Sequence, residues 1–406
     1  MSILYIIGPT DPNETQHFLT ELFTDPEIIP MGPLQSYLGP YIAKRRTPKI
    51  TAQYQQIGGS PIKKWTELQG AEMCRKLDEL SPDTAPHKYY ICFRYAAPQT
   101  ESCINDMLRD GVTRAIAFSQ YPQFSCTTTG SSYNHLWREL KRLQHESTFQ
   151  WSVIDRWLHN DKFINSVKIR IEQGLHRLKS NNKSLHDDDI LILFSAHSLP
   201  VKVVTRGDAY CHEVHRTVEL VMSSFSYQYK HLLSWQSKVG YLPWLTPSTA
   251  DTIQGLGKQG YKNILIVPIA FTSDHVETLY EIDIEYNELA HKSGITNFVR
   301  TDGLNDLPEI TDALADIVHK HIASNQVSTP QYQMNCIHCI NPDCRRILNP
   351  IKPYNNMRTK YHKQNIAIQS DDTVDRKLDD ANDALNQAAA ATHDSVKQST
   401  QKAARM

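Results

Sequence analysis

Residues 190–200 read ILILFSAHSLP, five large apolar side chains in a row followed by a short polar turn. A strand this apolar is typical of a parallel sheet that is covered on both faces. Similar short runs, closed by Gly, Pro or polar residues, recur at 3–7, 89–95, 115–118, 232–239 and 264–271, and longer amphipathic stretches lie between them at 101–109, 133–144, 211–224 and 310–322. This alternation predicts an α/β fold with parallel sheets and right-handed crossovers.

Two of the strands follow similar turns, which indicates two similar halves. The sequence DGVTRAIAF at 110–118 resembles QGYKNILIV at 259–267. The polar region 173–189, which includes SNNKSLHDDD, breaks the apolar periodicity and is the expected boundary between the halves. Ligands of open α/β sheets bind at the carboxyl ends of the strands, so the residues that follow each strand are the candidate site.

The composition is that of a globular protein of the cell interior. The chain has 406 residues, enough for two domains, and its 43 Lys and Arg nearly balance 44 Asp and Glu, so no net field attracts nucleic acid. Eight cysteines do not form the dense pattern of a secreted disulfide scaffold. No apolar run approaches the ~20 residues of a membrane-spanning helix. The N-terminal MSILYIIGPT has neither a secretory signal nor an Arg-rich transit segment.

A ladder of carboxylates follows the last of these apolar runs, in FTSDHVETLYEIDIEY at 271–286. On a helix Glu277, Glu281 and Glu285 would stack at i, i+4 and i+8, and each like-charged pair costs roughly 0.2–0.5 kcal/mol. Apolar residues lie between them, so we expect the segment to be largely buried and to pass protons or cations: Val276, Leu279, Ile282 and Ile284. A solvated helix face paired with Lys and Arg is the alternative.

Imidazole and carboxylate groups follow two different strands. His197 comes directly after the strand of 190–194, and Asp274, His275 and Glu277 follow the run of 264–271. A histidine after a buried strand is often an ordinary core residue, but two strand ends that deliver such groups to one sheet edge indicate proton or metal traffic.

Aromatic and basic side chains suggest a flat ligand and a surface that contacts membranes. The candidates for the ligand site are Tyr54, Arg94, Tyr95, Tyr210, Trp235 and Trp244, although ordinary packing explains any one of them singly. Near the N-terminus an apolar set precedes a basic cluster, a pattern of membrane-interface surfaces and also of a plain helix with a charged end: Ile28, Ile29, Met31, Leu34 and Leu38 before Lys44, Arg45, Arg46 and Lys49.

Three cysteines gather in CIHCINPDC at 336–344, which predicts a metal site. Cys336, Cys339 and Cys344 leave a four-ligand site one donor short. Zinc could recruit His338, whereas a [2Fe-2S] cluster needs a distant fourth thiolate, for which Cys126 in YPQFSCTTTGSS is the candidate.

From about residue 3 to 346 the chain closely resembles ferrochelatases, specifically the animal, mitochondrial type with a C-terminal cluster. The segments that carry the resemblance are IAKRRTPKI (42–50), HKYYICFRYA (87–96), RAIAFSQYPQFSCTTTGSS (114–132), LFSAHSLP (193–200), WQSKVGYLPWL (235–245) and NILIVPIAFTSDHVETLYEIDIEY (263–286). The resemblance implies insertion of Fe²⁺ into protoporphyrin IX, with release of two protons, as the last step of haem biosynthesis. It further implies two Rossmann-like halves of the chelatase fold, a homodimer, and a peripheral location on the matrix side of the mitochondrial inner membrane.

The resemblance also assigns roles to residues. His197 matches the active-site histidine, expected to act as the general base, and Glu277 its partner across the porphyrin, while Asp274, His275, Glu281 and Glu285 match the polar track. Arg46 and Ser60 match propionate contacts, Tyr54, Arg94, Tyr95 and Tyr210 line the site, and Trp235 and Trp244 form its walls. Cys126, Cys336, Cys339 and Cys344 match the four ligands of a [2Fe-2S] cluster.

The expected organisation is therefore an N-terminal half at 1–175, a C-terminal half at 186–325, a cluster extension at 326–347 and a helical or disordered tail at 348–406. The chain departs from the family where YIIGP places Ile6 and Ile7 at methionine and glycine positions, and where Ala97 replaces a histidine. The alternatives to iron insertion are a chelatase for another tetrapyrrole or metal, and a non-catalytic porphyrin- or haem-binding iron-sulfur sensor.

Overall fold

The computed structural model describes residues 2–5, 9, 11–29, 31–181, 184–240, 242–329, 344 and 347. Residues 1–348 form one compact unit, and residues 349–406 form a second unit that falls outside the described part of the chain. The expected tail, the departures at Ile6 and Ile7, and two of the candidate cluster ligands, Cys336 and Cys339, also lie outside the described residues.

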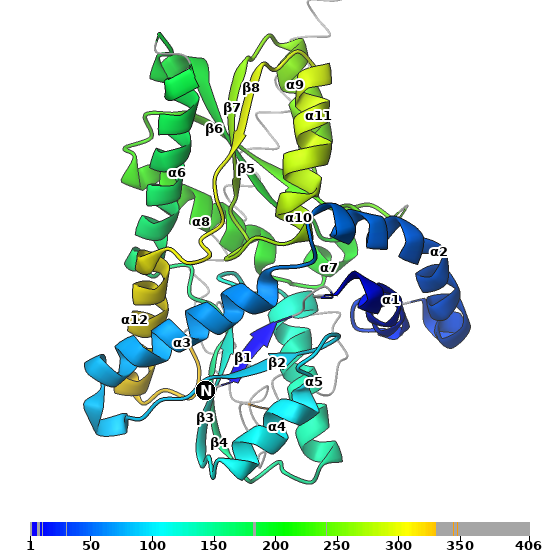
Figure 1. Cartoon of the computed structure of the whole chain (residues 1–406), viewed down its shortest axis with the longest axis vertical. Helices are drawn as coiled ribbons and strands as arrows, with labels where there is room; N and C mark the ends of the chain where they lie inside the picture. The colour runs from blue at the N-terminus through cyan, green and yellow to red at the C-terminus, as the bar shows by residue number, and fades with distance from the viewer. Residues whose placement is uncertain are drawn as a thin grey trace, which may run out of the picture. The chain divides into compact units, whose positions relative to one another are not determined.

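Two four-stranded parallel sheets form the centre of the first unit (Figure 1). The first sheet has the order β2-β1-β3-β4, and its strands are β1 Ser2–Tyr5, β2 Tyr90–Phe93, β3 Arg114–Ser119 and β4 Gln150–Ile154. The second has the order β6-β5-β7-β8, and its strands are β5 Ile190–His197, β6 Lys230–Gln236, β7 Asn263–Pro268 and β8 Asn297–Arg300. The α/β class is thus confirmed.

The two sheets are wound in the same way, since each half's first strand lies between its second and third. The two segments with similar turns, which lead into β3 and β7, occupy equivalent places in this order. Sequence reasoning missed β4 and β8, each at one edge of its sheet, because their apolar runs are short. In β5 every residue except His197 is buried, as expected for a central strand.

Helices cover the sheets and connect the strands (Figure 1). Those of the first half are α1 Thr15–Thr24, α2 Gln35–Gln56, α3 Ile62–Leu80, α4 Thr100–Arg109 and α5 Ser131–Arg142. Those that follow are α6 Asp161–Asn181, α7 Val201–Thr205, α8 Tyr210–Ser224, α9 Thr249–Lys258, α10 Val276–Leu279, α11 Asn287–Lys292 and α12 Pro308–Ser324. Short 3₁₀ turns occur at Pro12–Glu14, Gly32–Leu34, Pro82–Thr84 and Asp187–Asp189, and π-helical segments at Cys126–Gly130 and Glu281–Tyr286.

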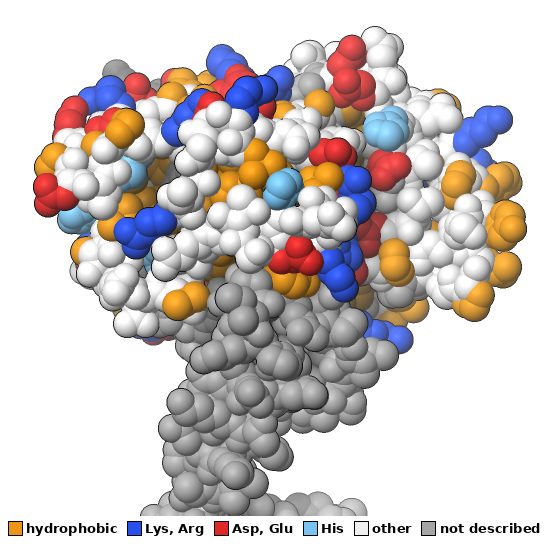
Figure 2. All heavy atoms as spheres, turned by 90° about the horizontal axis from the view of Figure 1, so that it is seen from below, with side chains coloured by type: hydrophobic (Ala, Val, Ile, Leu, Met, Phe, Trp, Pro, Cys, Tyr) orange, Lys and Arg blue, Asp and Glu red, His pale blue; other side chains and the backbone are white. Residues whose placement is uncertain are grey.

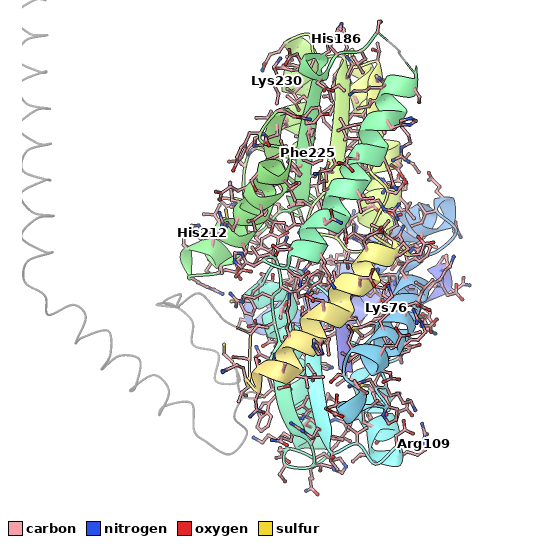
Figure 3. All side chains as sticks on the ribbon, turned by 90° about the vertical axis from the view of Figure 1, so that its left-hand side faces the viewer. Lys76, Arg109, His186, His212, Phe225 and Lys230 are labelled. Atoms are coloured by element: carbon pink, nitrogen blue, oxygen red, sulfur yellow. The ribbon has the colours of Figure 1, made fainter. Side chains whose placement is uncertain are left out.

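The halves share one hydrophobic core. A single cluster of buried side chains includes Met73 and Phe118 of the first half together with Ile192, Leu265 and Leu314. Helix α12 packs against both α6 and α3, where Lys76 Nζ reaches Thr311 and Asp312 (Figure 3). Helix α6 continues to Asn181, through residue 175, where the sequence placed the end of the first half.

Helices α1 and α2 form a hairpin with a small core of its own. Leu19, Phe23 and Ala43 are buried in it, and Ile29 and Met31 pack against them. The expected apolar surface is therefore partly wrong, because Ile29 and Met31 are half-buried in this core. The exposed apolar face instead comprises residues at i, i+3, i+4 and i+7 of one helical stripe: Leu34, Tyr37, Leu38 and Tyr41. Figure 2 shows hydrophobic side chains gathered at the right-hand edge of the molecule, the side on which this hairpin projects in Figure 1.

Within the described residues no helix has the length and apolar content needed to cross a membrane.

Candidate active site

The carboxyl edge of the second sheet brings the predicted residues of two strands together. His197 ends β5 and pairs in register with Gln236, the last residue of the neighbouring β6. The loop after β7, on the other side of β5, delivers Asp274, His275 and Glu277. Because parallel strands end at the same edge, His197, His275 and Glu277 converge there as the sequence predicted.

Glu277 lies between two imidazoles. Its Oε1 is 3.5 Å from Nε2 of His197, and its Oε2 is 3.0 Å from Nε2 of His275. Nδ1 of His197 is 2.6 Å from the carbonyl oxygen of Ser198, and Nδ1 of His275 is 3.0 Å from that of Ser273. A carbonyl oxygen only accepts hydrogen bonds, so each Nδ1 carries the proton and each Nε2 faces the carboxylate.

This arrangement keeps Glu277 ionised. Burial disfavours the charged form, but the charge of His197 and the hydrogen bond and charge of His275 outweigh it and lower the pKa of Glu277 to about 2. An ionised carboxylate between two imidazoles can stabilise a proton that is held on the Nε2 of either ring.

One expectation about this group is wrong. Glu277 was placed across the porphyrin from His197, but a ring between them would need about 7 Å, two carbon contact distances, and the atoms are 3.5 Å apart. In this structure the two side chains face each other directly.

Glu281 and Glu285 continue from Glu277 toward the surface. The segment is a π-helix from Glu281 to Tyr286 between α10 and α11, where a regular helix was expected. Glu281 is half-buried and Glu285 is exposed, as is Ile284, so the prediction of a largely buried segment is wrong for its outer end. The ladder therefore runs from the histidine pair to solvent. Burial and the neighbouring charge of Glu281 raise the pKa of Glu285, and Lys49 of α2 opposes this shift.

Three residues that sequence reasoning missed hold Glu281. Its carboxylate accepts hydrogen bonds from Gln236 Nε2 at 3.2 Å, Ser237 N at 2.9 Å, Ser237 Oγ at 2.5 Å and Tyr286 Oη at 2.7 Å. Gln236 also donates to the carbonyl of Glu277 at 3.0 Å, so it joins successive members of the ladder. The available signal was the position of Gln236 at the end of a strand and of Ser237 directly after it.

Asp274 lies apart from the ladder. Its Oδ1 accepts from Thr278 Oγ1 at 3.0 Å and pairs with Arg300 Nη1 at 2.7 Å, and its Oδ2 accepts from Asn305 Nδ2 at 2.7 Å. One of these partners, Thr278, belongs to α10, so the contacts of Asp274 hold the start of α10 in place.

Two of the predicted aromatic residues, Tyr54 and Tyr210, lie near Glu277, and Trp235 and Trp244 contact its neighbours. Burial, followed by the charge of Glu277, raises the pKa of both Tyr54, from α2, and Tyr210, from α8. The ring of Tyr210 lies 6.0 Å from that of Trp235, centroid to centroid, and the ring of Trp244 lies 6.4 Å from that of His197. Trp235 is buried in the shared core, whereas Trp244 is half-exposed.

Arg94 and Tyr95, two of the residues expected to line the site, have partners within the protein. The Arg94 side chain is buried and pairs with Asp25 and with Glu27, the latter at 2.7 Å, and Tyr95 Oη donates to Asp25 at 2.7 Å. Arg94 and Tyr95 thus anchor the connection between α1 and α2. Two further nitrogens of Arg94, Nε and Nη1, are buried without a protein partner.

Arg46 and Ser60 are not joined to the histidine pair by any contact among the described residues. The guanidinium of Arg46 lies over the ring of Phe23, 5.6 Å from its centroid, and Ser60 is buried beyond the end of α2.

Of the four candidate cluster cysteines, Cys126 is exposed at the start of the π-helical segment before α5, and Cys344 is half-buried. No group of three or more His, Cys, Asp or Glu side chains suited to a metal occurs among the residues that the structure describes.

Two parallel sheets with the same strand order, with an ionised carboxylate between two imidazoles at one carboxyl edge, define an α/β protein of the two-half Rossmann class with a candidate acid–base site. Comparison with known proteins gives the family. The ferrochelatase family model matches residues 6–322. The chain is 51% identical over 340 residues to "Ferrochelatase, mitochondrial" of Bos taurus, covering 83% of this chain and 80% of the bovine protein. It is 51% identical over 340 residues to "Ferrochelatase, mitochondrial" of Homo sapiens, covering 83% of this chain and 79% of the human protein. It is 43% identical over 343 residues to "Ferrochelatase, mitochondrial" of Schizosaccharomyces pombe, covering 84% of this chain and 80% of that protein.

This chain belongs to the ferrochelatase family. The resemblance inferred from the sequence is confirmed, and with it the expected function, insertion of ferrous iron into a porphyrin in haem biosynthesis, and the mitochondrion as its location. Among solved structures, SirB from Bacillus subtilis with Fe³⁺ has a TM-score of 0.43 and 14% identity, covering 64% of this chain and 92% of that one.

Proposed function

We propose that His197, Glu277 and His275 remove the two pyrrole protons that protoporphyrin IX loses when it takes up Fe²⁺. The observation that carries this proposal is the single carboxylate shared by two imidazoles whose Nδ1 protons are fixed. A dication can replace the two protons only if bases accept them, and histidine is the side chain best suited to do so near neutral pH.

The proton leaves a pyrrole nitrogen for Nε2 of His197, and the anionic Glu277 stabilises the resulting imidazolium. From there it passes to Nε2 of His275 or outward along Glu281 and Glu285. Glu281 is held by four hydrogen bonds, which fixes one relay position midway between the histidine pair and solvent. Asp274 is assigned a positioning role, since its contacts fix α10 rather than the ladder.

For the porphyrin we propose a place beside Trp244, Tyr54 and Tyr210, with its propionates toward Arg46, Ser60 and the Arg94–Tyr95 pair. The two unpartnered nitrogens of Arg94 support an interaction with a carboxylate that the protein itself does not supply. Trp235 supports Tyr210 from the core.

The test is metal insertion into protoporphyrin IX by purified protein, followed by absorption, for Glu277→Gln and for Glu288→Gln as the matched control. Glu288 is exposed on α11 and pairs with Lys292 at 2.6 Å. Loss of a general acid–base partner lowers kcat by about 10²–10⁴-fold, and the control should keep wild-type turnover. Equal turnover in both variants would remove Glu277 from the chemistry.

We also propose that Cys126, Cys336, Cys339 and Cys344 hold a [2Fe-2S] cluster. After α12 the chain pairs with β4 through Ser328 and Val153. Ile347 is buried in the same core as residues of α5, and α5 starts five residues after Cys126. Both ends of the cysteine-rich extension are thus attached to the half that carries Cys126, which supports a site built from all four thiols. Visible absorption of anaerobically purified protein tests it, because a cluster gives charge-transfer bands and zinc gives none.

The exposed face of Leu34, Tyr37, Leu38 and Tyr41 supports peripheral contact with a membrane, and the inner membrane on its matrix side is the location that we propose. Tyr37→Ser with Tyr41→Ser should weaken sedimentation with anionic vesicles, and Tyr227→Ser, an exposed tyrosine after α8, serves as the control. We propose the homodimer and the division into halves at 1–175 and 186–325 on the family resemblance, and sedimentation velocity tests the dimer.

A further inference from the structure

The loop that carries Cys126 is bound to the beginning of α8 by two buried carboxylates. Oδ2 of Asp208 accepts from the backbone N of Cys126 at 2.6 Å and from Ser125 Oγ at 3.0 Å. One Oε of Glu213 accepts from the backbone N of Phe124 at 2.7 Å. Asp208 is 2% exposed and Glu213 is fully buried, so neither carboxylate can exchange these partners for water.

The same aspartate fixes an active-site residue. Its other oxygen, Oδ1, accepts from the backbone N of Tyr210 at 2.9 Å, and Tyr210 is the first residue of α8. The ring of Tyr210 packs on Trp235 and lies close enough to Glu277 to be affected by its charge. The backbone of Cys126 and that of Tyr210 therefore share one carboxylate.

A second connection reaches α8 from the start of the C-terminal extension. Thr329 Oγ1 donates to Asp155 at 2.6 Å, Asp155 pairs with Arg156 at 3.1 Å, and Arg156 pairs with Glu213 at 2.5 Å. Thr329 is the last described residue before the segment with the three clustered cysteines. The outer side of this turn of α8 is solvent-exposed at His212, which Figure 3 labels, so the network occupies the inner side.

A buried carboxylate accepts hydrogen bonds at both oxygens and donates none. If the Cys126 loop moves, Asp208 must either move with it, and so shift the amide of Tyr210, or leave a buried donor unpaired, which is costly. The contact is therefore a mechanical link between the loop and the first turn of α8.

We infer that Asp208 and Glu213 are positioning residues that couple the Cys126 loop to Tyr210, so that the occupancy of the Cys126 thiol by a metal centre sets the affinity for porphyrin. The inference rests on two parts of the proposed function, the placement of Tyr210 beside the porphyrin and the cluster held by Cys126. Coupling of this kind is reciprocal, because porphyrin must then change metal retention at Cys126 by the same factor.

The test is a double-mutant cycle on porphyrin affinity, measured by quenching of protoporphyrin IX fluorescence with the full chain. Asp208→Asn keeps the volume of the side chain but replaces one acceptor oxygen with an NH2 donor. That NH2 would face either the donors of the Cys126 loop or the backbone N of Tyr210, so the variant cannot keep both connections. Asp208→Asn and Cys126→Ser should each raise the Kd about five-fold or more, the lower range of typical coupling. The double variant should be no weaker than Asp208→Asn alone. Asp302→Asn, which removes a half-exposed partner of Arg177, is the control and should bind as wild type.

Hydrogen exchange provides a second readout that does not depend on activity. In Asp208→Asn, peptides covering 121–132 and 208–216 should lose protection together, whereas a purely local cap would affect only the second. If Asp208→Asn does not fold, Ser125→Ala removes one donor of the same arm and should show a smaller change of the same kind.

Strictly additive effects of Asp208→Asn and Cys126→Ser, or wild-type affinity in Asp208→Asn, would overturn the coupling. Tyr210→Ala separates this failure from a failure of the proposed function. If Tyr210→Ala binds porphyrin as wild type, the placement of Tyr210 is wrong; if it binds weakly while Asp208→Asn does not, only the coupling is wrong.

Discussion

Replacing Glu27 by Gln should loosen the hairpin of α1 and α2 from the body of the protein. Glu27 accepts hydrogen bonds from Arg94 at 2.7 Å, Arg138 at 2.9 Å and Asn134 at 3.1 Å, and its side chain is only 17% exposed. The hairpin otherwise has a separate small core, so this network is a main attachment of the segment that carries Arg46 and Tyr54.

The magnitude follows from the pKa of Glu27. Burial raises it, but the hydrogen bond of Arg138 and the charges of Arg94 and Arg138 dominate and lower the pKa from 4.5 to about 2. A depression of about 2.5 units corresponds to roughly 3 kcal/mol of folding free energy. Because the folded-state pKa is the lower one, this stabilisation is present above about pH 4.5 and is lost as the pH falls toward 2.

Urea unfolding of wild type and Glu27→Gln should therefore differ by roughly 3 kcal/mol at pH 7 and by clearly less at pH 3. Glu21→Gln, an exposed site on α1, is the control and should be within about 0.5 kcal/mol of wild type. The KM for porphyrin should rise in Glu27→Gln as Arg94 loses its anchor. A loss below about 0.5 kcal/mol at pH 7, or an equal loss at both pH values, would refute this reasoning.

Two glycines of α9 should respond oppositely to alanine. At Gly257 a Cβ would lie 2.2 Å from the carbonyl oxygen of Ser293, so Gly257→Ala should cost about 1–3 kcal/mol by overpacking. Gly255 has nothing within 4 Å of such a Cβ, so Gly255→Ala should stabilise the helix by about 0.5–1 kcal/mol. Thermal unfolding measures both changes, and two melting temperatures that shift in the same direction would contradict the packing of α9 on α11. Glu281→Gln removes the charge of the ladder's middle member and sets its amide NH2 against two of the four donors whose hydrogen bonds the carboxylate accepts. We therefore expect kcat for metal insertion to fall at least about ten-fold with the porphyrin Kd nearly unchanged. A fall in affinity alone would show that Glu281 shapes the binding site rather than the proton path.

The sequence predicted the sheets well because their signal is local. The run ILILF of β5 is apolar enough to identify a central strand, and the matching turns before β3 and β7 correctly indicated two similar halves. The edge strands β4 and β8 carry shorter runs and were missed. The convergence of His197 with His275 and Glu277 followed from the rule that parallel strands end at one edge.

Details that depend on side-chain partners could not be predicted. The residues around Arg94 do not show that its guanidinium pairs with Asp25 and Glu27, almost seventy positions earlier in the chain. The spacing of Glu277, Glu281 and Glu285 fits a regular helix, and the π-helical turn that replaces it arises from packing and from the bonds of Gln236, Ser237 and Tyr286 to Glu281. The 3.5 Å separation of His197 from Glu277 likewise depends on how two loops pack.

The most direct test of the proton-transfer site is metal insertion by His197→Ala, with His186→Ala as the control near the opposite end of the same strand (Figure 3). Insertion of Fe²⁺ or Zn²⁺ into protoporphyrin IX is followed by absorption, and porphyrin binding by fluorescence. We expect His197→Ala to bind porphyrin within a few-fold of wild type but to lose at least about 10²-fold in kcat, and His186→Ala to be unchanged. Near-normal kcat in His197→Ala would contradict the assignment of the proton acceptor.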